Sequence, residues 1–216
     1  MPEVHLVFPT PIWTDKLGLD TISRLKIIDF LESVGWEKGE DMYGRSDGWN
    51  TTVIDLLSSP ELSEVASLIH TNMERYVHEF LGVMTERHSL RRSDSWSTKQ
   101  MMGDACHEHN HSNSIFSGVY YPSVPKDSGE YLHFVTLYPT WKTNEHEYDI
   151  DEVGIHNKIW FDQKLEDDLI VIFPSWLMHS VGPSTSDLPR YCIPFNYVID
   201  GEFGGTTNYL RVSGRL

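Results

Sequence analysis

From about residue 89 to its end, the chain is divided into short apolar runs, rich in β-branched and aromatic residues and separated by Gly, Pro, Asn and Asp. Such runs are typical of strands joined by turns. Because no helical segment lies between them, they predict an antiparallel sandwich or barrel. The expected strands are Ser95–Met102, Ile115–Tyr121, Tyr131–Tyr138, Asn157–Phe161, Leu169–Phe173, His179–Val181, Tyr191–Val198 and Thr206–Val212.

Two helices are expected before these strands. The first can be capped by Asp20 or Thr21 and ends at Gly35, and the second begins at Ser59-Pro60 and ends at Gly82. The apolar residues of the first helix, spaced three apart, are Ile22, Leu25, Ile28, Leu31 and Val34. We therefore predict one α+β domain over residues 1–216, mainly β, with residues 1–88 as helical support on one outer face and residues 89–216 as the core.

The charge of the chain limits its partners. Seventeen basic against thirty-two acidic residues give a net charge of −15, which repels nucleic-acid phosphates and anionic membranes. Two cysteines are too few for a disulfide framework, and no apolar run approaches the length of about 18 residues that a membrane helix needs. We expect a cytoplasmic protein that acts on a small-molecule or peptide substrate, without nucleic-acid or membrane partners. The oligomeric state is left open.

A histidine-rich segment is the best candidate for chemistry. In an extended chain, His107, His109 and His111 all project to one side, so two of them could bind one metal ion. His179 follows the apolar run Leu169–Phe173 and is the best candidate for a third ligand. The run is equally compatible with an exposed loop that binds metal adventitiously, and a single histidine beside apolar residues is often a hydrogen-bonded core residue.

A basic residue adds weight to the metal hypothesis. Arg190 opens the apolar strand Tyr191–Val198, and an arginine that enters a barrel interior needs a carboxylate partner. A ligand that chelates metal at one end and carries a carboxylate at the other would satisfy both groups. Cys106 is expected to pack as a small buried residue rather than to bind the metal.

Four segments together carry a family resemblance. They read HNHSNSIFSGVYY from His109, SGEYLHF from Ser128, FPSWLMHSVGP from Phe173 and RYCIPFN from Arg190. With Phe8–Ile12 near the N-terminus, they resemble the 2-oxoglutarate and Fe(II) dependent oxygenases, in particular a bacterial and phage group of them. The resemblance spans most of the chain. It implies a double-stranded β-helix, which is a cupin-like jelly roll, and a prolyl-hydroxylase-like dioxygenase.

The resemblance also implies residue roles. His109, His111 and His179 would bind Fe(II), and Arg190 would bind the distal carboxylate of 2-oxoglutarate with Tyr121 as a second anchor. Ser117 and Tyr121 alternate onto one strand face, so both are expected to point inward to the cofactor. The reaction implied is hydroxylation of an unidentified substrate, with release of succinate and carbon dioxide.

One departure from the family pattern concerns the metal. His111 stands where a carboxylate ligand is usual, which gives three neutral imidazoles and raises the net charge of the centre by one. His107 is held in reserve as the partner of His109. Two other functions stay open: a three-histidine cupin-type dioxygenase that does not use 2-oxoglutarate, and a non-catalytic metal-binding pseudoenzyme.

Overall fold

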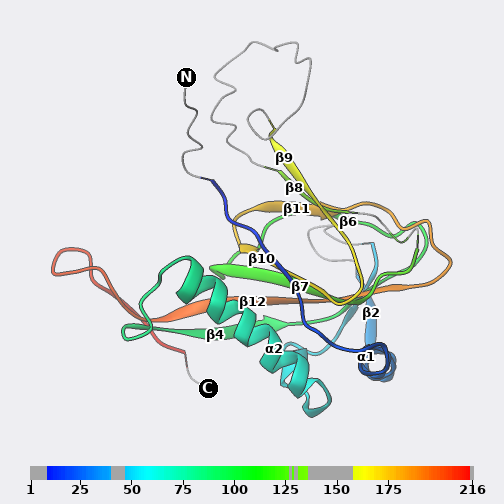
Figure 1. The fold of residues 1–216 in the computed structure, drawn as a ribbon, viewed down its shortest axis with the longest axis horizontal. Coiled ribbons are helices and arrows are strands. Elements are labelled where there is room, and N and C mark those ends of the chain that lie inside the picture. Colours follow the sequence, from blue (N-terminus) through cyan, green and yellow to red (C-terminus); the bar gives the residue numbers. More distant parts are fainter. Residues whose placement is uncertain (1–8, 40–46, 127, 129–130, 136–157, 215–216) are drawn as a thin grey trace, which may run out of the picture.

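The computed structural model describes residues 9–39, 47–126, 128, 131–135 and 158–214. Within these residues, antiparallel strands form two sheets that face each other (Figure 1). The strands are β1 (Trp13–Lys16), β2 (Trp36–Lys38), β3 (Trp49–Thr51), β4 (His88–Ser95), β5 (Thr98–Gln100), β6 (Cys106–His109), β7 (Phe116–Ser123), β8 (Tyr131–Val135), β9 (Trp160–Lys164), β10 (Leu169–Pro174), β11 (Met178–Val181), β12 (Arg190–Phe203) and β13 (Leu210–Val212).

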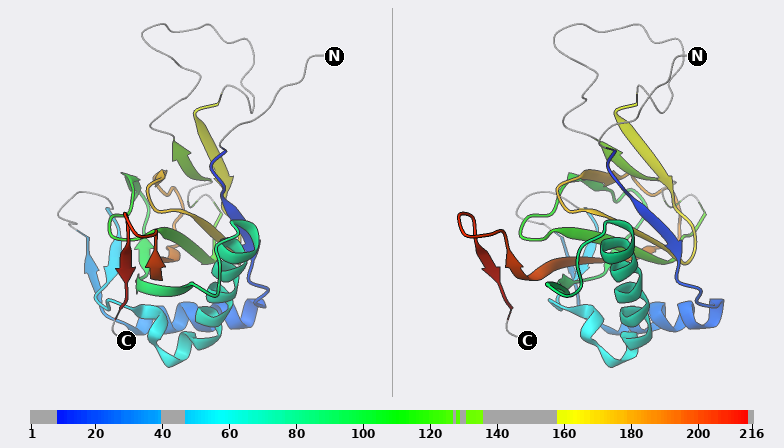
Figure 2. Two further views of the ribbon diagram at one scale, coloured as in Figure 1. Left: turned by 90° about the vertical axis from the view of Figure 1, so that its left-hand side faces the viewer. Right: turned by 60° about the vertical axis from the view of Figure 1, so that its left-hand side comes forward.

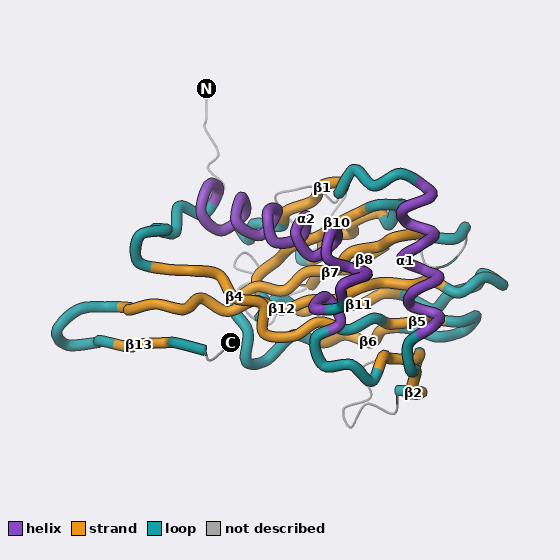
Figure 3. The backbone as a smooth tube through the Cα atoms, turned by 90° about the horizontal axis from the view of Figure 1, so that it is seen from below, coloured by secondary structure: helices purple, strands orange, loops and turns teal. Residues whose placement is uncertain are grey.

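The larger sheet has the order β1-β10-β7-β12-β5-β3-β2, and β4 and β13 also pair with β12. The smaller sheet has the order β6-β11-β8-β9. The far end of β12 and β13 form a hairpin that projects from the body of the molecule (Figure 3). Strand β12 therefore pairs with four strands of the larger sheet, β4, β5, β7 and β13.

The helices lie on the outer face of the larger sheet, opposite the smaller sheet (Figure 2). Helix α1 (Thr21–Ser33) is capped by Asp20, whose carboxylate accepts from the N–H of Ser23 at 2.7 Å. The second helical segment begins as the 3₁₀ turns η1 (Leu56–Ser58) and η2 (Pro60–Leu62), continues as α2 (Ser63–Glu74) and ends in a π-helical turn, η3 (Arg75–Phe80). None of the described helices has the length and apolarity that a membrane crossing would require.

The buried face of α1 differs from the predicted one. Ile27 and Leu31 are buried, whereas Ile22 and Leu25 are 67% and 53% exposed. Three residues advance a helix by about 300° rather than a full turn, so a strict spacing of three drifts around the helix. The stripe that meets the sheet instead includes the spacing of four between Ile27 and Leu31.

The strands β7 and β10 are buried on both faces, and their side chains alternate between two cores. Tyr120 and Ile172 belong to the core under the helices, and Tyr121 and Phe173 belong to the core between the sheets. Antiparallel pairing of the two strands keeps these faces in register. The inward face of β7 and β10 therefore forms one wall of the space between the sheets.

Several boundaries differ from the sequence predictions. Strand β4 begins at His88, and the predicted strand Ser95–Met102 is broken between Ser95 and Thr98. Strands β1 to β3 place parts of residues 1–88 in the larger sheet, in addition to the helices. Parts of the predicted strands at 136–138 and 157 lie outside the described residues. The single-domain assignment stays a prediction.

Candidate metal centre

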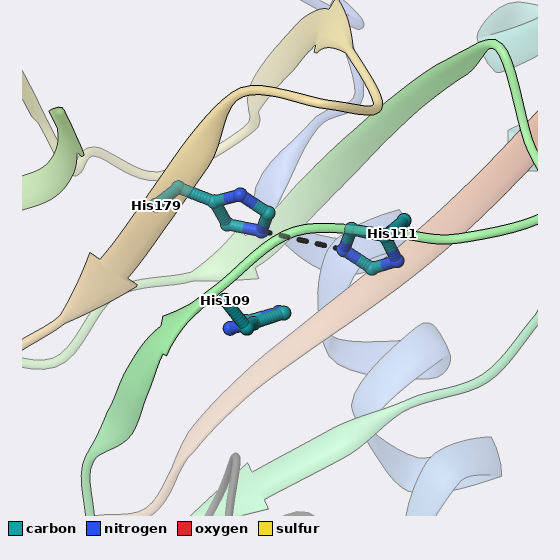
Figure 4. Close-up of side chains that lie close together, drawn as sticks. All are labelled: His109, His111 and His179. Atoms are coloured by element: carbon teal, nitrogen blue, oxygen red, sulfur yellow. Dashed lines mark hydrogen bonds between the residues drawn. The ribbon is translucent and has the colours of Figure 1, made fainter. Parts of the chain in front are cut away.

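Three histidines meet between the sheets. His109 ends β6, His179 lies directly opposite it in β11, and His111 follows two residues beyond the end of β6. One ring nitrogen from each lies within 4.8 Å of the others, and Figure 4 shows the three rings grouped together. The Nε2 atoms of His111 and His179 are 3.3 Å apart. The structure thus brings together the three residues named as ligands from the sequence.

A β-bulge separates His107 from this cluster. His179 pairs with His109 but Val181 pairs with Cys106, so one extra residue lies in β6 between the two pairs. A bulge interrupts the alternation of side chains, and the inward positions become Cys106 and His109. The Cys106 Sγ atom is 3.7 Å from His109 Nδ1. His107 instead contacts Asp47 through Nε2 at 3.1 Å, and both side chains are half exposed. The expected alternation is therefore wrong at His107.

Backbone carbonyls orient two of the imidazoles. His109 Nδ1 lies 2.7 Å from the carbonyl oxygen of His107, and His179 Nδ1 lies 2.9 Å from that of Leu177. A carbonyl oxygen only accepts hydrogen bonds, so Nδ1 carries the proton in both rings and Nε2 carries the lone pair. Metal-binding histidines are commonly oriented in this way. Both rings are therefore prepared to bind a cation through Nε2.

Electrostatics keep the deepest imidazole neutral. His179 is 5% exposed, and its burial, with the neighbouring His109 and His111, holds its pKa well below the usual 6.5. A neutral imidazole is the form that binds a metal ion. His179 is therefore available as a ligand at neutral pH without first losing a proton.

A cavity of about 80 Å³ extends from the histidines between the two sheets. The larger sheet contributes Thr98, Gln100, Tyr121 and Cys192 to its lining, and the smaller sheet contributes Cys106 and Leu132. The Trp96 ring also lines the cavity, with its centroid 5.8 Å from that of His111. The volume is that of a small ligand, so a larger substrate would have to bind at its mouth.

Arg190 is buried beside this cavity and has neutral partners. It is 1% exposed, and its Nε donates to Gln100 Oε1 at 3.1 Å. Its Nη2 also donates to Gln100 Oε1, and its Nη1 donates to the carbonyl oxygen of Ser128. Among the described residues, no carboxylate forms an ion pair with it. Three of the five guanidinium N–H groups are thus engaged, which leaves one on each Nη atom.

Further polar groups beside Arg190 are able to hydrogen-bond a ligand. Gln100 Nε2 and Ser128 Oγ are buried, and neither has a hydrogen-bond partner among the described residues. Tyr121, 2% exposed, lines the cavity, and burial raises the pKa of its hydroxyl well above 10. The hydroxyl therefore stays protonated and able to donate. These groups could together receive an anionic ligand.

Ser117 does not line the cavity. It is 1% exposed, but its hydroxyl bonds Ser175 Oγ at 2.8 Å and Asn196 Oδ1 at 2.7 Å instead of lining the cavity. The sequence prediction also missed Gln100, Thr98, Trp96 and Ser175. Thr98 and Gln100 alternate as polar residues on one face of a predicted strand, and this pattern is the signal that could have identified them.

The part of the chain that carries this site matches a known protein family. Residues 94–196 match the model of a family described as "Putative 2OG-Fe(II) oxygenase". No curated protein sequence matches the chain. The family segment contains Arg190 and the three histidines, and this agrees with the resemblance noted in the sequence.

Solved structures show the fold. The chain is similar to HygX from Streptomyces hygroscopicus with nickel and 2-oxoglutarate bound, at 10% identity and a TM-score of 0.60, covering 88% of this chain and 83% of that one. It is also similar to a Pseudomonas putida prolyl-4-hydroxylase, at 12% identity and a TM-score of 0.55, with coverages of 87% and 92%. The epimerase SnoN from nogalamycin biosynthesis gives 13% identity and a TM-score of 0.62, with coverages of 89% and 79%. The double-stranded β-helix predicted from the sequence is confirmed.

Proposed function

We propose that this chain is an Fe(II)- and 2-oxoglutarate-dependent dioxygenase that hydroxylates a small-molecule or peptide substrate, because residues 94–196 match the model of the 2OG-Fe(II) oxygenase family. The reaction would convert substrate, 2-oxoglutarate and dioxygen into hydroxylated substrate, succinate and carbon dioxide. One observation carries the proposal: three converging imidazoles line a cavity, and Gln100 in the lining of the same cavity accepts from a buried arginine that has no described carboxylate partner.

The donor set fits a divalent metal ion. His109 and His179 donate their Nδ1 protons to carbonyl oxygens, so both can offer Nε2 to the ion, and His111 Nε2 lies beside that of His179. Three imidazoles suit iron, and three protein ligands leave coordination positions for a chelating ligand and for dioxygen. When bound, Fe(II) would supply the activation of dioxygen that the reaction requires.

The polar groups beside Arg190 fit a carboxylate. Its two remaining guanidinium N–H groups, with Gln100 Nε2, Ser128 Oγ and the Tyr121 hydroxyl, can all donate to the distal carboxylate of 2-oxoglutarate. An ionised carboxylate has about four acceptor sites, so it can use most of these donors. Burial strengthens such charge-assisted bonds and justifies a cation that would otherwise be costly to bury.

Two solved structures support the substrate class. One HygX structure contains hygromycin B, and a Trichoplax adhaerens prolyl hydroxylase contains a peptide fragment. In the present chain, the small cavity would be filled largely by the cofactor. The substrate would therefore bind at the mouth beside Trp96, where the ring lies next to His111.

The test is an anaerobic titration of the Fe(II)-loaded protein with 2-oxoglutarate. We expect a visible metal-to-ligand charge-transfer band that saturates with 2-oxoglutarate and is lost in His179→Ala. Stoichiometric iron without this band would overturn the 2-oxoglutarate assignment in favour of a three-histidine dioxygenase. The band without succinate release, in air and with any substrate library, would favour a pseudoenzyme.

A further inference from the structure

His111 is the one histidine of the cluster that no strand holds. Strand β6 ends at His109, and residues 110–115 connect it to β7 without strand pairing. The backbone N–H of His111 donates to the carbonyl oxygen of Ser175 at 2.9 Å. Ser175 in turn donates its own N–H to the carbonyl oxygen of Ile115 at 3.0 Å. The segment that carries His111 is thus attached at both ends to Ser175.

Ser175 belongs to a turn that also orients His179. The turn joins β10 to β11, and the carbonyl oxygen of Leu177 accepts the Nδ1 proton of His179 at 2.9 Å. Two of the three imidazoles therefore depend on residues 174–177. The position of this turn relative to the sheets decides how His111 and His179 face each other.

A network of hydrogen bonds between buried and half-buried side chains fixes the turn to the larger sheet. Ser114 Oγ donates to Ser175 Oγ at 2.9 Å, and Ser175 Oγ lies 2.8 Å from Ser117 Oγ. Ser117 Oγ donates to Asn196 Oδ1 at 2.7 Å, and Asn196 Nδ2 donates to Asp94 Oδ2 at 3.0 Å. The network thus links the segment that carries His111, through the turn, to β7, β12 and β4.

Every hydrogen bond in this network is donated in the same direction, from Ser114 toward Asp94. The Asp94 carboxylate only accepts, so the Asn196 amide must turn Nδ2 toward it and Oδ1 toward Ser117. Ser117 then gives its only proton to Asn196, and so Ser175 must donate to Ser117. Ser114 must likewise donate to Ser175. Because a single set of hydroxyl orientations satisfies every hydrogen bond in the network, the network holds Ser175 in one position.

We propose that Ser175 is a positioning residue for the metal centre: its side chain is locked by Ser114, Ser117 and Asn196, and its carbonyl oxygen fixes His111. The inference rests on the proposed metal site and adds a role for Ser117 that differs from cofactor binding. Removing the Ser175 hydroxyl leaves Ser114 without its acceptor and Ser117 without its donor in a buried site. The turn then loses its fixed attachment, and His111 loses its defined place beside His179.

The experiment measures Co(II) binding to the metal-free full-length chain by competition with a chelator, and records the visible spectrum of the bound ion. We expect Ser175→Ala to weaken Co(II) binding about 10- to 100-fold, as for other residues that orient metal ligands. Its Co(II) spectrum should also change in intensity and position. Ser114→Ala, which removes only the outermost donor, should cause a smaller loss in the same direction.

Ser184→Ala is the matched control. Ser184 is as buried as Ser175, at 1% exposure, but its hydroxyl accepts from the N–H of Ser186 in the loop between β11 and β12. A similar loss of stability is expected there, with the Co(II) affinity and spectrum of the unchanged protein.

The outcomes separate this inference from the proposed function. If Ser175→Ala and Ser114→Ala both bind Co(II) within twofold of the unchanged protein and with the same spectrum, while His111→Ala binds it weakly, the positioning role is wrong and the metal site stands. If His111→Ala and His179→Ala also leave Co(II) affinity unchanged, the metal site itself is wrong. Should Ser175→Ala not fold, the Ser114→Ala result decides the positioning role.

Discussion

Arg190 has a different environment from most buried arginines, because its described acceptors are the amide oxygen of Gln100 and the carbonyl oxygen of Ser128. Neutral acceptors leave the positive charge uncompensated until an anion binds. Gln100 also directs Arg190, since one oxygen accepts from both Nε and Nη2. The positive charge of Arg190 can therefore be neutralised by a substitution at Gln100, without changing Arg190 itself.

Gln100→Glu should weaken 2-oxoglutarate binding. The new carboxylate has the same shape, would pair with Arg190 and would repel the incoming carboxylate. We expect the affinity to fall about 30- to 150-fold, since a hydrogen bond to a charged group contributes roughly 2–3 kcal/mol. Isothermal titration of the Ni(II)-loaded protein with 2-oxoglutarate checks this. Unchanged affinity in this variant, with Ni(II) still bound, would contradict the role of Gln100.

His107→Ala and His109→Ala should behave differently. The bulge in β6 turns His107 to Asp47 at the surface and His109 to His179 inside. We expect His107→Ala to keep the Ni(II) affinity of the unchanged protein, and His109→Ala to lose at least about tenfold, because a ligand is missing. Equilibrium dialysis with Ni(II) measures both. Equal losses in the two variants would mean that the bulge does not separate the two imidazoles.

These residues also mark how far the sequence predicts the site. The sequence identified the three histidines that the structure brings together, His109, His111 and His179, although His107 was expected on the same face. Nothing in the sequence Cys106–His109 marks a bulge, since it contains neither Gly nor Pro. Ser117 faces the expected side, but its hydroxyl is turned by partners far away in the chain.

At the scale of the elements, central strands were predicted better than edge strands. β7, β10 and β12 are largely buried on both faces, and so their sequences are nearly continuous apolar runs. β2 and β3 have three residues each, of which only Thr51 is buried, and such short strands leave little pattern. Their place in the larger sheet is decided by partners, not by their own propensity.

A carboxylate ties the turn η1 to strand β4. Asp55 accepts from Arg92 Nε at 2.8 Å, from Ser95 Oγ at 2.7 Å and from the Ser58 hydroxyl. Burial alone would raise the pKa of Asp55, but these hydrogen bonds, with that of Arg92 the strongest, outweigh it and lower the pKa from 3.8 to about 2. The folded state therefore favours the ionised form more than the unfolded chain does.

The stability that Asp55 provides should depend on pH. This stabilisation is fully present above the unfolded pKa of 3.8 and is lost as the pH falls through about 2. Below that pH the carboxyl group is protonated in both the folded and the unfolded state, so its ionisation no longer stabilises the fold. The side chain is 34% exposed, so after solvent screening we expect no more than about 1–2 kcal/mol. Urea unfolding from pH 6 to pH 2.5 should show Asp55→Asn less stable at pH 6, with a gap that narrows on acidification.

Asp29→Asn provides the comparison, because Asp29 is exposed on α1 and its carboxylate forms no ion pair or hydrogen bond with the described residues. That variant should follow the unchanged protein closely at every pH. A gap between Asp55→Asn and the unchanged protein that stayed constant down to pH 2.5 would show that the ionised carboxylate is not the source of the stability.

At the scale of the whole molecule, the candidate site lies between the two sheets. His109 and His179 belong to the smaller sheet, whereas Gln100 and Arg190 belong to the larger one. Sequence periodicity places each residue on a strand face, but it does not say which sheet faces which. That relation came from the family resemblance, and the packing of Leu132 and Phe134 against Val171 and Phe173 provides its physical basis.

A ligand that spans this interface should stabilise the fold cooperatively. Ni(II) at about 100 times its dissociation constant adds roughly 2.7 kcal/mol to the free energy of unfolding, which raises the midpoint of thermal unfolding by roughly 5–10 °C. 2-Oxoglutarate would bind Ni(II) through its 2-oxo acid end and Arg190 through its distal carboxylate, and so would join the two sheets. We expect the rise with both ligands to exceed the sum of the separate rises in differential scanning fluorimetry.

Two controls locate the source of this cooperativity. Succinate has the distal carboxylate but lacks the 2-oxo group that chelates the metal, so it should add little to the rise with Ni(II). Arg190→Gln should keep the rise produced by Ni(II) and lose the increment from 2-oxoglutarate, because the charge on the larger sheet is gone while the histidines are untouched. If 2-oxoglutarate stabilised the protein equally with and without Ni(II), its two ends would not bridge the sheets, and the cavity would bind it in another orientation.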